Sequence, residues 1–139
     1  MIDSTKTVLC MFSGGIDSTG VIDKLFTDPK LSQSPLIINH VIIQNRENRA
    51  KAEASAVQSI LNYYKGKFPK REFTFTNVTF GTLGFAPLKS EKFADDSDIC
   101  AFIAGNISVV RKDIGYIFQS DTKTTLSNLN DKRIIQKEK

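Results

Sequence analysis

A short apolar segment, followed at once by a glycine turn and a helical pattern, constrains the fold of this chain more than any other feature. Residues 7–12 begin with a threonine and continue as an unbroken apolar run, as in a strand buried inside a parallel sheet. The next six residues read Ser-Gly-Gly-Ile-Asp-Ser, and apolar residues at helical spacing follow to about residue 26. This order predicts the first half of a β–α–β unit, with the turn at the carboxyl end of its strand.

The remaining sequence continues the alternation of strands and helices. We expect further strands at 36–44, 72–80 and 115–119, and helices at about 47–64 and 98–110. Such alternation predicts an α/β fold with a mainly parallel sheet of four to five strands, in which ligands bind at the carboxyl ends of the strands. The segment 81–97 is a long loop, which indicates function or disorder.

Some finer expectations concern the helices and the tail. Lys65-Gly66 is a plausible end for the long helix. Its inward stripe should comprise Ala50, Ala54, Val57, Ile60, Leu61 and Tyr64. The last long helix should turn inward Ile99, Phe102, Ile103, Ile107 and Val110. Residues 1–120 should form one nucleotide-binding domain, and residues 121–139 a polar, basic tail that is irregular or partly helical.

Composition narrows the class of protein. The chain has 139 residues, of which 40% are hydrophobic and 24% charged, as in a soluble globular domain. No apolar run is long enough for a membrane span, and the polar start is unlike a signal peptide, so we expect a cytoplasmic protein without membrane contact. The net charge of +4 suits a phosphate-bearing ligand or a nucleic acid, but the basic residues lack interleaved aromatics and favour a solvated surface.

Few residues in the chain can bind a metal. Cys10 and Cys100 lie in apolar patterns and are expected to be buried, unreactive thiols. Two cysteines and one histidine cannot complete a four-ligand zinc site, so none is expected. The histidine, His40, lies in an apolar strand, where a core position is favoured over a ligand role. An acidic cluster can bind metal or form a solvated loop whose Asp96 or Ser97 caps a helix; it comprises Glu91, Asp95, Asp96 and Asp98.

The glycine turn carries the chemistry. Gly14 and Gly15 let the backbone approach a ligand closely, and the N–H groups at the start of the helix favour an anion. Ser13, Ser18 and Thr19 add hydroxyl groups. Asp17 either coordinates Mg²⁺ or caps the helix. The turn is neither a Walker A loop nor a dinucleotide-binding turn, because neither of those patterns is present.

The segment Ser-Gly-Gly-Ile-Asp-Ser matches the signature Ser-Gly-Gly-x-Asp-Ser, and on it the chain resembles the PP-loop ATP pyrophosphatases, the adenine-nucleotide α-hydrolase-like group. It is most similar to the 7-cyano-7-deazaguanine synthases. The similar segments are 8–19, 45–49 with Glu53, and 102–106. The chain lacks the arginine before Asn106, is shorter, and lacks the family's cysteine cluster for zinc. The resemblance implies a Rossmann-like, HUP-type three-layer sandwich.

The resemblance also implies an activity and a site. The carboxylate of a small substrate would attack the α-phosphorus of ATP, giving an acyl adenylate and releasing pyrophosphate. Ammonia would then displace AMP with formation of a C–N bond. The cofactors would be ATP and Mg²⁺. The implied nucleotide contacts are Ser13, Gly14, Gly15, Ile16, Asp17, Ser18, Thr19 and Gln44. Catalytic roles would fall to Asp17, Ser18 and Arg49, with Asp17 also binding Mg²⁺. Arg46, Gly105 and Asn106 would contact the substrate.

Two other functions remain open on the sequence. The short chain without the cysteine cluster fits a non-catalytic module that binds or sequesters an adenine nucleotide and acts on a partner. The resembling superfamily also includes tRNA-modifying enzymes, so modification of tRNA or of a nucleobase is a further alternative. Arg49 and Glu53 can form a surface ion pair in place of a ligand contact. A homodimer is expected, and the acceptor substrate is unspecified.

Overall fold

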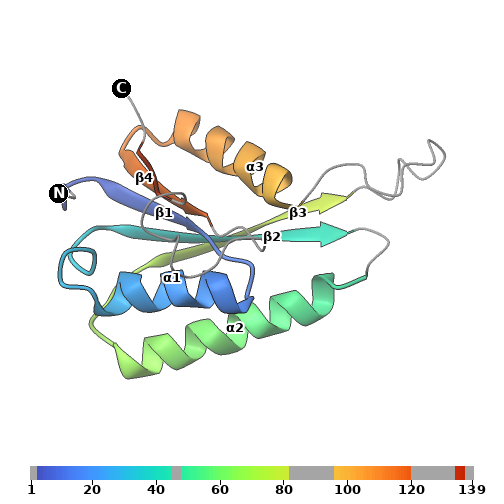
Figure 1. Ribbon diagram of the computed structural model, residues 1–139, viewed down its shortest axis with the longest axis horizontal. Coiled ribbons are helices and arrows are strands. Elements are labelled where there is room, and N and C mark those ends of the chain that lie inside the picture. The colour runs from blue at the N-terminus through green and yellow to red at the C-terminus, as the bar shows by residue number, and fades with distance from the viewer. Residues whose placement is uncertain (1–2, 45–47, 82–95, 120–133, 137–139) are drawn as a thin grey trace.

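A five-stranded sheet forms the centre of the computed structural model, which describes residues 3–44, 48–81, 96–119 and 134–136. Strands and helices alternate along the chain as expected (Figure 1). The elements are β1 (Thr7–Met11), α1 (Ile16–Thr27), β2 (Leu36–Gln44), α2 (Ala50–Lys67), β3 (Thr74–Gly81), α3 (Asp96–Val110), β4 (Ile114–Gln119) and β5 (Ile134–Gln136).

The strand order is β3-β2-β1-β4-β5. Strands β1 to β4 run parallel, and β5 pairs antiparallel with β4. The chain leaves β1 for β2 on one side and later returns to place β4 on the other side of β1. The carboxyl ends of β1 and β4 are therefore the topological switch point, where parallel sheets bind ligands.

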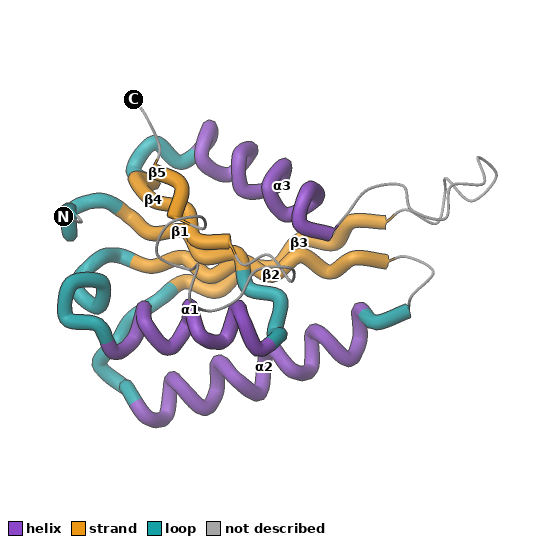
Figure 2. The backbone as a smooth tube through the Cα atoms, in the orientation of Figure 1, coloured by secondary structure: helices purple, strands orange, loops and turns teal. Residues whose placement is uncertain are grey.

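Helices cover both faces of the sheet, so the described chain has three layers. Figure 2 shows α1 and α2 on one face and α3 on the other. Alternate strand residues supply one apolar cluster beneath α1 and α2, which includes Val8, Cys10 and Ile38. The residues between them, including Leu9 and Met11, supply a second cluster beneath α3. The expected α/β architecture is confirmed.

The long helix α2 does not end at Lys65-Gly66 as expected. It continues to Lys67, and the N–H of Phe68 donates to the carbonyl of Tyr64. The ring of Phe68 lies 6.0 Å from that of Phe26, so packing on α1 outweighs the helix-ending tendency of glycine. Of the expected inward stripe, Val57, Leu61 and Tyr64 are buried, and the other three members are partly buried.

Two residues of α3 were placed inward by the sequence and are exposed. Phe102 is 65% exposed and Val110 is 79% exposed. Ile99 is buried, and Ile103 and Ile107 pack partly against the sheet. Phe102 lies about 100° around the helix from Ile103, on the outer side. Val110 is the last helical residue and reaches past the packed layer.

The tail is not wholly irregular or helical as expected, because residues 134–136 form β5. Its register pairs Ile135 with Ile117 in β4. A short segment with two β-branched residues suits a strand, and it satisfies the open edge of β4. None of the described helices is both long and apolar enough to cross a bilayer.

Candidate functional site

The glycine loop, residues 13–18, lies where the sequence placed it, between the carboxyl end of β1 and the start of α1. Gly14 has a φ of +86°, a conformation that residues with a Cβ rarely adopt. A Cβ built at Gly14 would lie 3.1 Å from Val57 Cγ2 and 3.4 Å from the carbonyl oxygen of Glu53. Position 14 therefore requires glycine for two reasons, its backbone angle and its close approach to α2.

Hydroxyl groups hold the glycine loop in shape. The Oγ atoms of Ser13 and Ser18 lie 2.9 Å apart, and the N–H of Gly15 donates to Ser13 Oγ at 3.4 Å. Ser18 and Thr19 both donate to the Gly15 carbonyl, at 3.3 and 2.7 Å. Ser18 is only 1% exposed, whereas Ser13 is exposed. Ser18 thus organises the loop from beneath, and Ser13 is the serine that faces solvent.

The start of α1 is left open for an anion. Its N-cap is Gly15, which has no side chain to satisfy the first backbone N–H groups, and no side-chain cap is present. Asp17 lies inside the first turn, so the capping role that the sequence left open for it is not observed. Its half-buried carboxylate has no hydrogen bond or ion pair within the described residues. One free carboxylate beside an uncapped helix start suits Mg²⁺, which usually takes one or two carboxylates and completes its shell with phosphate and water.

His40 anchors the residue that precedes the glycine loop. Its Nδ1 lies 2.8 Å from the carbonyl oxygen of Phe12, and the side chain is 2% exposed. A carbonyl oxygen can only accept, so Nδ1 carries a proton and donates it to Phe12. Nε2 is buried and finds no partner in the described part of the chain. His40 is therefore a core residue, as the sequence favoured, and it also ties β2 to the root of the loop.

Helix α2 flanks the loop through Val57 and Glu53, and Arg49 lies one turn before Glu53. Arg49 precedes α2, and its Nη1 lies 3.3 Å from Glu53 Oε1, the ion pair that the sequence allowed. Its side chain is 52% exposed, and such an i,i+4 pair contributes only about 0.3–0.5 kcal/mol. Gln44 ends β2 opposite Gly81, five residues beyond the level at which β1 ends, so its strand does not carry it to the loop.

The other expected substrate contacts lie elsewhere or outside the described residues. Gly105 and Asn106 are exposed in the second half of α3, and Asn106 Nδ2 donates to the Phe102 carbonyl at 2.7 Å. They lie inside α3, and the structure does not bring them to the loop. Arg46 lies outside the described residues. Ile16, a loop residue at the first position of α1, is 85% exposed.

Metal ligands do not cluster among the residues that the structure describes. Of the acidic cluster, Glu91 and Asp95 lie outside those residues, and Asp98 is exposed. Asp96 begins α3, but its side chain is not described. Cys10 is buried, which raises the pKa of its thiol to about 12, whereas Cys100 is only partly buried.

Sequence reasoning passed over two amides at the switch point. Gln119 ends β4 and pairs with Met11, and Met11 pairs on its other side with Asn39 of β2. Asn39 is 1% exposed inside a strand that reads as apolar. An amide in the middle of a buried apolar strand was the available signal, because such a group is costly unless it is used.

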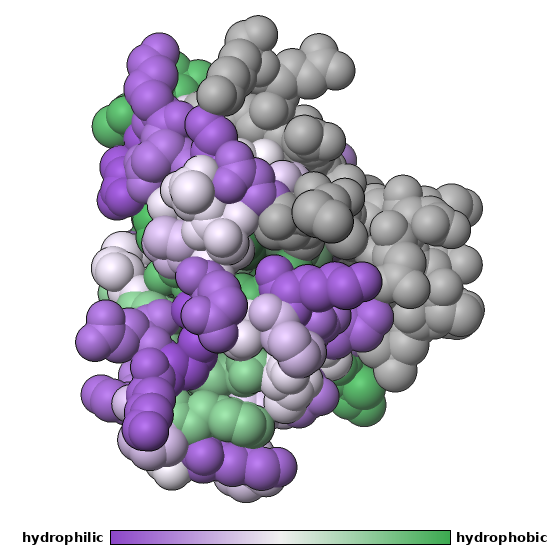
Figure 3. Space-filling view, turned by 90° about the vertical axis from the view of Figure 1, so that its left-hand side faces the viewer, coloured by the Kyte–Doolittle hydropathy of each residue, from purple (hydrophilic) through white to green (hydrophobic). Residues whose placement is uncertain are grey.

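The opposite end of the sheet is built for stability. A hollow of about 720 Å³ lies there, lined among others by Lys65, Arg71 and Arg111. Figure 3 shows this end as mainly hydrophilic with smaller apolar areas. Arg71 donates to backbone oxygens, including that of Ser34 at 2.8 Å, so its charge already holds the α1–β2 connection.

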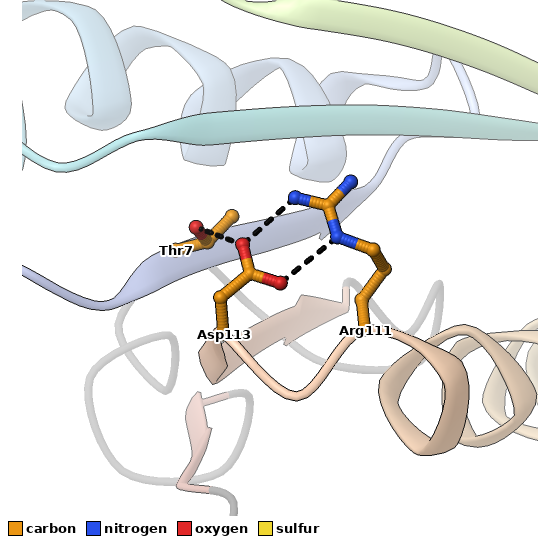
Figure 4. A network of polar contacts seen from close by, with 3 residues as sticks. All are labelled: Thr7, Arg111 and Asp113. Atoms are coloured by element: carbon orange, nitrogen blue, oxygen red, sulfur yellow. Dashed lines mark hydrogen bonds and ion pairs between the residues drawn. The ribbon is translucent and has the colours of Figure 1, made fainter.

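An ion pair at the same end joins α3 to β1. Arg111 contacts both oxygens of Asp113 at 2.8 Å, and Thr7 Oγ1 donates to Asp113 at 2.7 Å (Figure 4). The hydrogen bonds from Arg111 and then Thr7 hold the pKa of Asp113 well below its usual range. Both arginines of this end are therefore engaged in structural contacts, and the carboxyl end of the sheet is the better candidate site.

Comparison with known proteins supports the fold. The chain matches no protein-family model, and no curated protein is significantly similar to it. Among solved structures it is similar to the U34-tRNA thiolase NcsA from Methanococcus maripaludis, solved with its 4Fe-4S cluster, with a TM-score of 0.58 and 16% identity. The similarity covers 84% of this chain but only 39% of the thiolase.

A second solved structure is a universal stress protein in complex with cAMP, with 14% identity over 87% of this chain and all of the other. Its TM-score is 0.38, so no conclusion rests on it. The thiolase similarity confirms the Rossmann-like, HUP-type fold and, at its low identity, shows the fold alone.

Proposed function

We propose that this protein binds the phosphates of an adenine nucleotide on the glycine loop. The conformation of Gly14 carries the proposal, because a left-handed glycine packed on α2 leads into a helix whose N-terminus has no side-chain cap. Such a terminus presents backbone N–H groups to an anion. The loop also lies at the switch point of the sheet, and its sequence matches the PP-loop signature.

We propose further that the bound ATP adenylates a small acceptor, with release of pyrophosphate. The nucleophile of the acceptor would attack the α-phosphorus, and the bond to the bridging oxygen of the leaving pyrophosphate would break. Catalysis of this kind rests on positioning and charge stabilisation. Ser13, Thr19 and the first N–H groups of α1 would hold the leaving pyrophosphate. Asp17 would hold Mg²⁺, which would offset the charge on the phosphate oxygens.

Arg49 is the described cation best placed to add a contact to the nucleotide or the acceptor. It would exchange the carboxylate of Glu53 for a phosphate or carboxylate of the ligand, in the bidentate geometry that arginine favours. The exchange costs little free energy, because the exposed ion pair contributes little to the stability of the chain. Ser18 would act through the shape of the loop, since its hydroxyl is buried beneath Ser13.

A non-catalytic nucleotide-binding module is the second candidate, and one observation favours it. Within the described residues, the loop is flanked by a single free carboxylate and a single, already paired arginine. This set suffices to bind a nucleotide with Mg²⁺, but it lacks an evident general base for an acceptor. Any acceptor would have to arrive as a nucleophile that is already ionised, such as a carboxylate.

A turnover assay separates the two candidates. ATP labelled at the α- and γ-phosphates would be incubated with the protein, Mg²⁺ and a panel of small carboxylic acids. Adenylation predicts pyrophosphate together with an equal amount of the α-label in the adenylate of the acid, or in AMP once water has hydrolysed that adenylate. Both products should be lost in Asp17→Asn and retained in Asp98→Asn, a matched change at an exposed aspartate of α3. Release of ADP and phosphate would contradict the proposed reaction. Nucleotide binding without any turnover would favour the binding module.

A further inference from the structure

Two side-chain amides flank Met11 on the α3 face of the sheet, at the carboxyl end of the central strand. Met11 pairs with Gln119 of β4 on one side and with Asn39 of β2 on the other. Met11 belongs to the apolar cluster beneath α3, as do Ile117 and Val41, which lie two residues from Gln119 and Asn39 on the same faces of their strands. Both amides therefore point to the α3 side of the switch point.

Each amide uses its NH₂ group within the chain and leaves its oxygen without a partner. Gln119 Nε2 donates to the Ser97 carbonyl at 2.7 Å, and since that carbonyl can only accept, the orientation of the amide is set. Asn39 Nδ2 donates to Thr76 Oγ1 at 2.8 Å. Asn39 Oδ1 and Gln119 Oε1 are buried and have no hydrogen-bond partner among the described residues.

This acceptor pair, Asn39 Oδ1 and Gln119 Oε1, is costly in an apolar layer unless a ligand completes it. Buried polar atoms in folded proteins almost always find a partner, and each exception calls for a reason. Two acceptors whose own donors are already engaged can be satisfied only by a molecule that brings N–H or O–H groups. The neighbouring Met11, Ile117 and Val41 are apolar and suit a planar, uncharged ring rather than an ion.

We propose that the acceptor pair recognises the amino edge of a heteroaromatic base, the base of the nucleotide whose phosphates occupy the glycine loop. The inference rests on the proposed function and adds to it the two side chains that select the amino-bearing base. Met11 is two residues before Ser13, so the pair and the loop lie at the same, carboxyl end of β1. Both oxygens are buried. The hydrogen bond from Gln119 to the Ser97 carbonyl links the Gln119 amide to the first turn of α3, so a shift of that turn would change its exposure.

The test compares two nucleotides that differ by one group. ATP and purine riboside 5′-triphosphate carry the same phosphates and ribose, but only ATP has the 6-amino group. Calorimetric titration of the wild-type chain with Mg²⁺ should show ATP binding about tenfold more tightly, the factor expected for one to two hydrogen bonds to the amino group. In Asn39→Leu and Gln119→Leu, the ratio should fall towards one, with binding of the purine analogue little changed.

Ser34→Ala is the matched control. Ser34 Oγ is also buried without a partner in the described residues, but it precedes β2 at the opposite end of the sheet. This variant should keep the wild-type preference for ATP. The wild-type comparison remains decisive if Gln119→Leu fails to fold, and Asn39→Leu leaves the bond from Gln119 to Ser97 in place.

Equal binding of the two nucleotides by the wild type would overturn this inference and leave the proposed function standing. A preference for ATP that survives in both leucine variants would also overturn it. If neither triphosphate binds to the wild type, the proposed function fails, and this inference fails with it.

Discussion

Substitution of Gly14 by alanine should destabilise the chain markedly. The φ of +86° places an alanine in a conformation that costs an L-residue roughly 1–2 kcal/mol. The new Cβ would also lie 3.1 Å from Val57 Cγ2, so α2 would have to shift by a few tenths of an ångström. Together we expect the free energy of unfolding to fall by about 2–3 kcal/mol, within the range for strained backbone positions. Urea denaturation followed by circular dichroism measures this change.

Gly66→Ala is the control for Gly14→Ala. Gly66 lies in the last turn of α2, and a Cβ there would meet nothing within 4 Å. Alanine should raise stability by roughly 0.5–1 kcal/mol, because glycine is a poor helix former. Val57→Ala removes the near methyl group, so Gly14→Ala should cost less in that background. An unfolding free energy for Gly14→Ala within about 0.5 kcal/mol of wild type would refute the reasoning.

Three further predictions concern other residues. In His40→Asn, the amide nitrogen replaces Nδ1 as donor to the Phe12 carbonyl. This variant should bind ATP at least tenfold more tightly than His40→Ala in a calorimetric titration. Equal affinities of the two variants would refute the anchoring role. Native protein treated with a thiol reagent at pH 8 should react at Cys100 first, because burial raises the pKa of Cys10 to about 12; modification of Cys10 at the same rate would contradict this. Asp113→Asn should lower the urea midpoint at pH 7. The difference from wild type should shrink as the pH falls below about 4, because a carboxyl whose pKa is lowered by folding stabilises the chain fully above its unfolded pKa and loses that effect as the pH falls through its folded pKa. A difference that stays constant into acid would argue against the ion pair.

The strands and the loop were predictable from the sequence because their signals are local. Residues 36–44 form a strand with the predicted bounds, since an unbroken β-branched run can be buried on both faces. The glycine loop likewise falls between β1 and α1 because adjacent residues determine both its turn and its helix start. Local patterns of this kind need no knowledge of which strands are neighbours.

The features that were not predicted depend on contacts between distant residues. The end of α2 depends on Phe68 packing against Phe26, far away in the sequence. The exposure of Phe102 depends on how α3 rotates on the sheet, which its weakly periodic pattern does not determine. The nearness of Asn39 and Gln119 depends on strand order and register. None of these relations can be read from one segment alone.

The candidate site residues follow the same distinction between local signals and contacts of distant residues. Residues within the loop are held together by short-range hydrogen bonds, as between Ser13 and Ser18. Gln44 and Asn106 came from the resemblance rather than from local chemistry, and the structure does not bring them to the loop. Their proposed roles, like that of Arg46, remain predictions.

Calorimetric titration of the wild-type chain with ATP, in the presence and absence of Mg²⁺, tests the central claim most directly. We predict saturable binding that is strengthened by Mg²⁺, weakened at least tenfold in Ser13→Ala combined with Asp17→Ala, and unchanged in Gly66→Ala. Binding that is equally tight in the double variant would place the nucleotide away from the glycine loop. No binding by a folded wild-type chain would contradict the claim altogether.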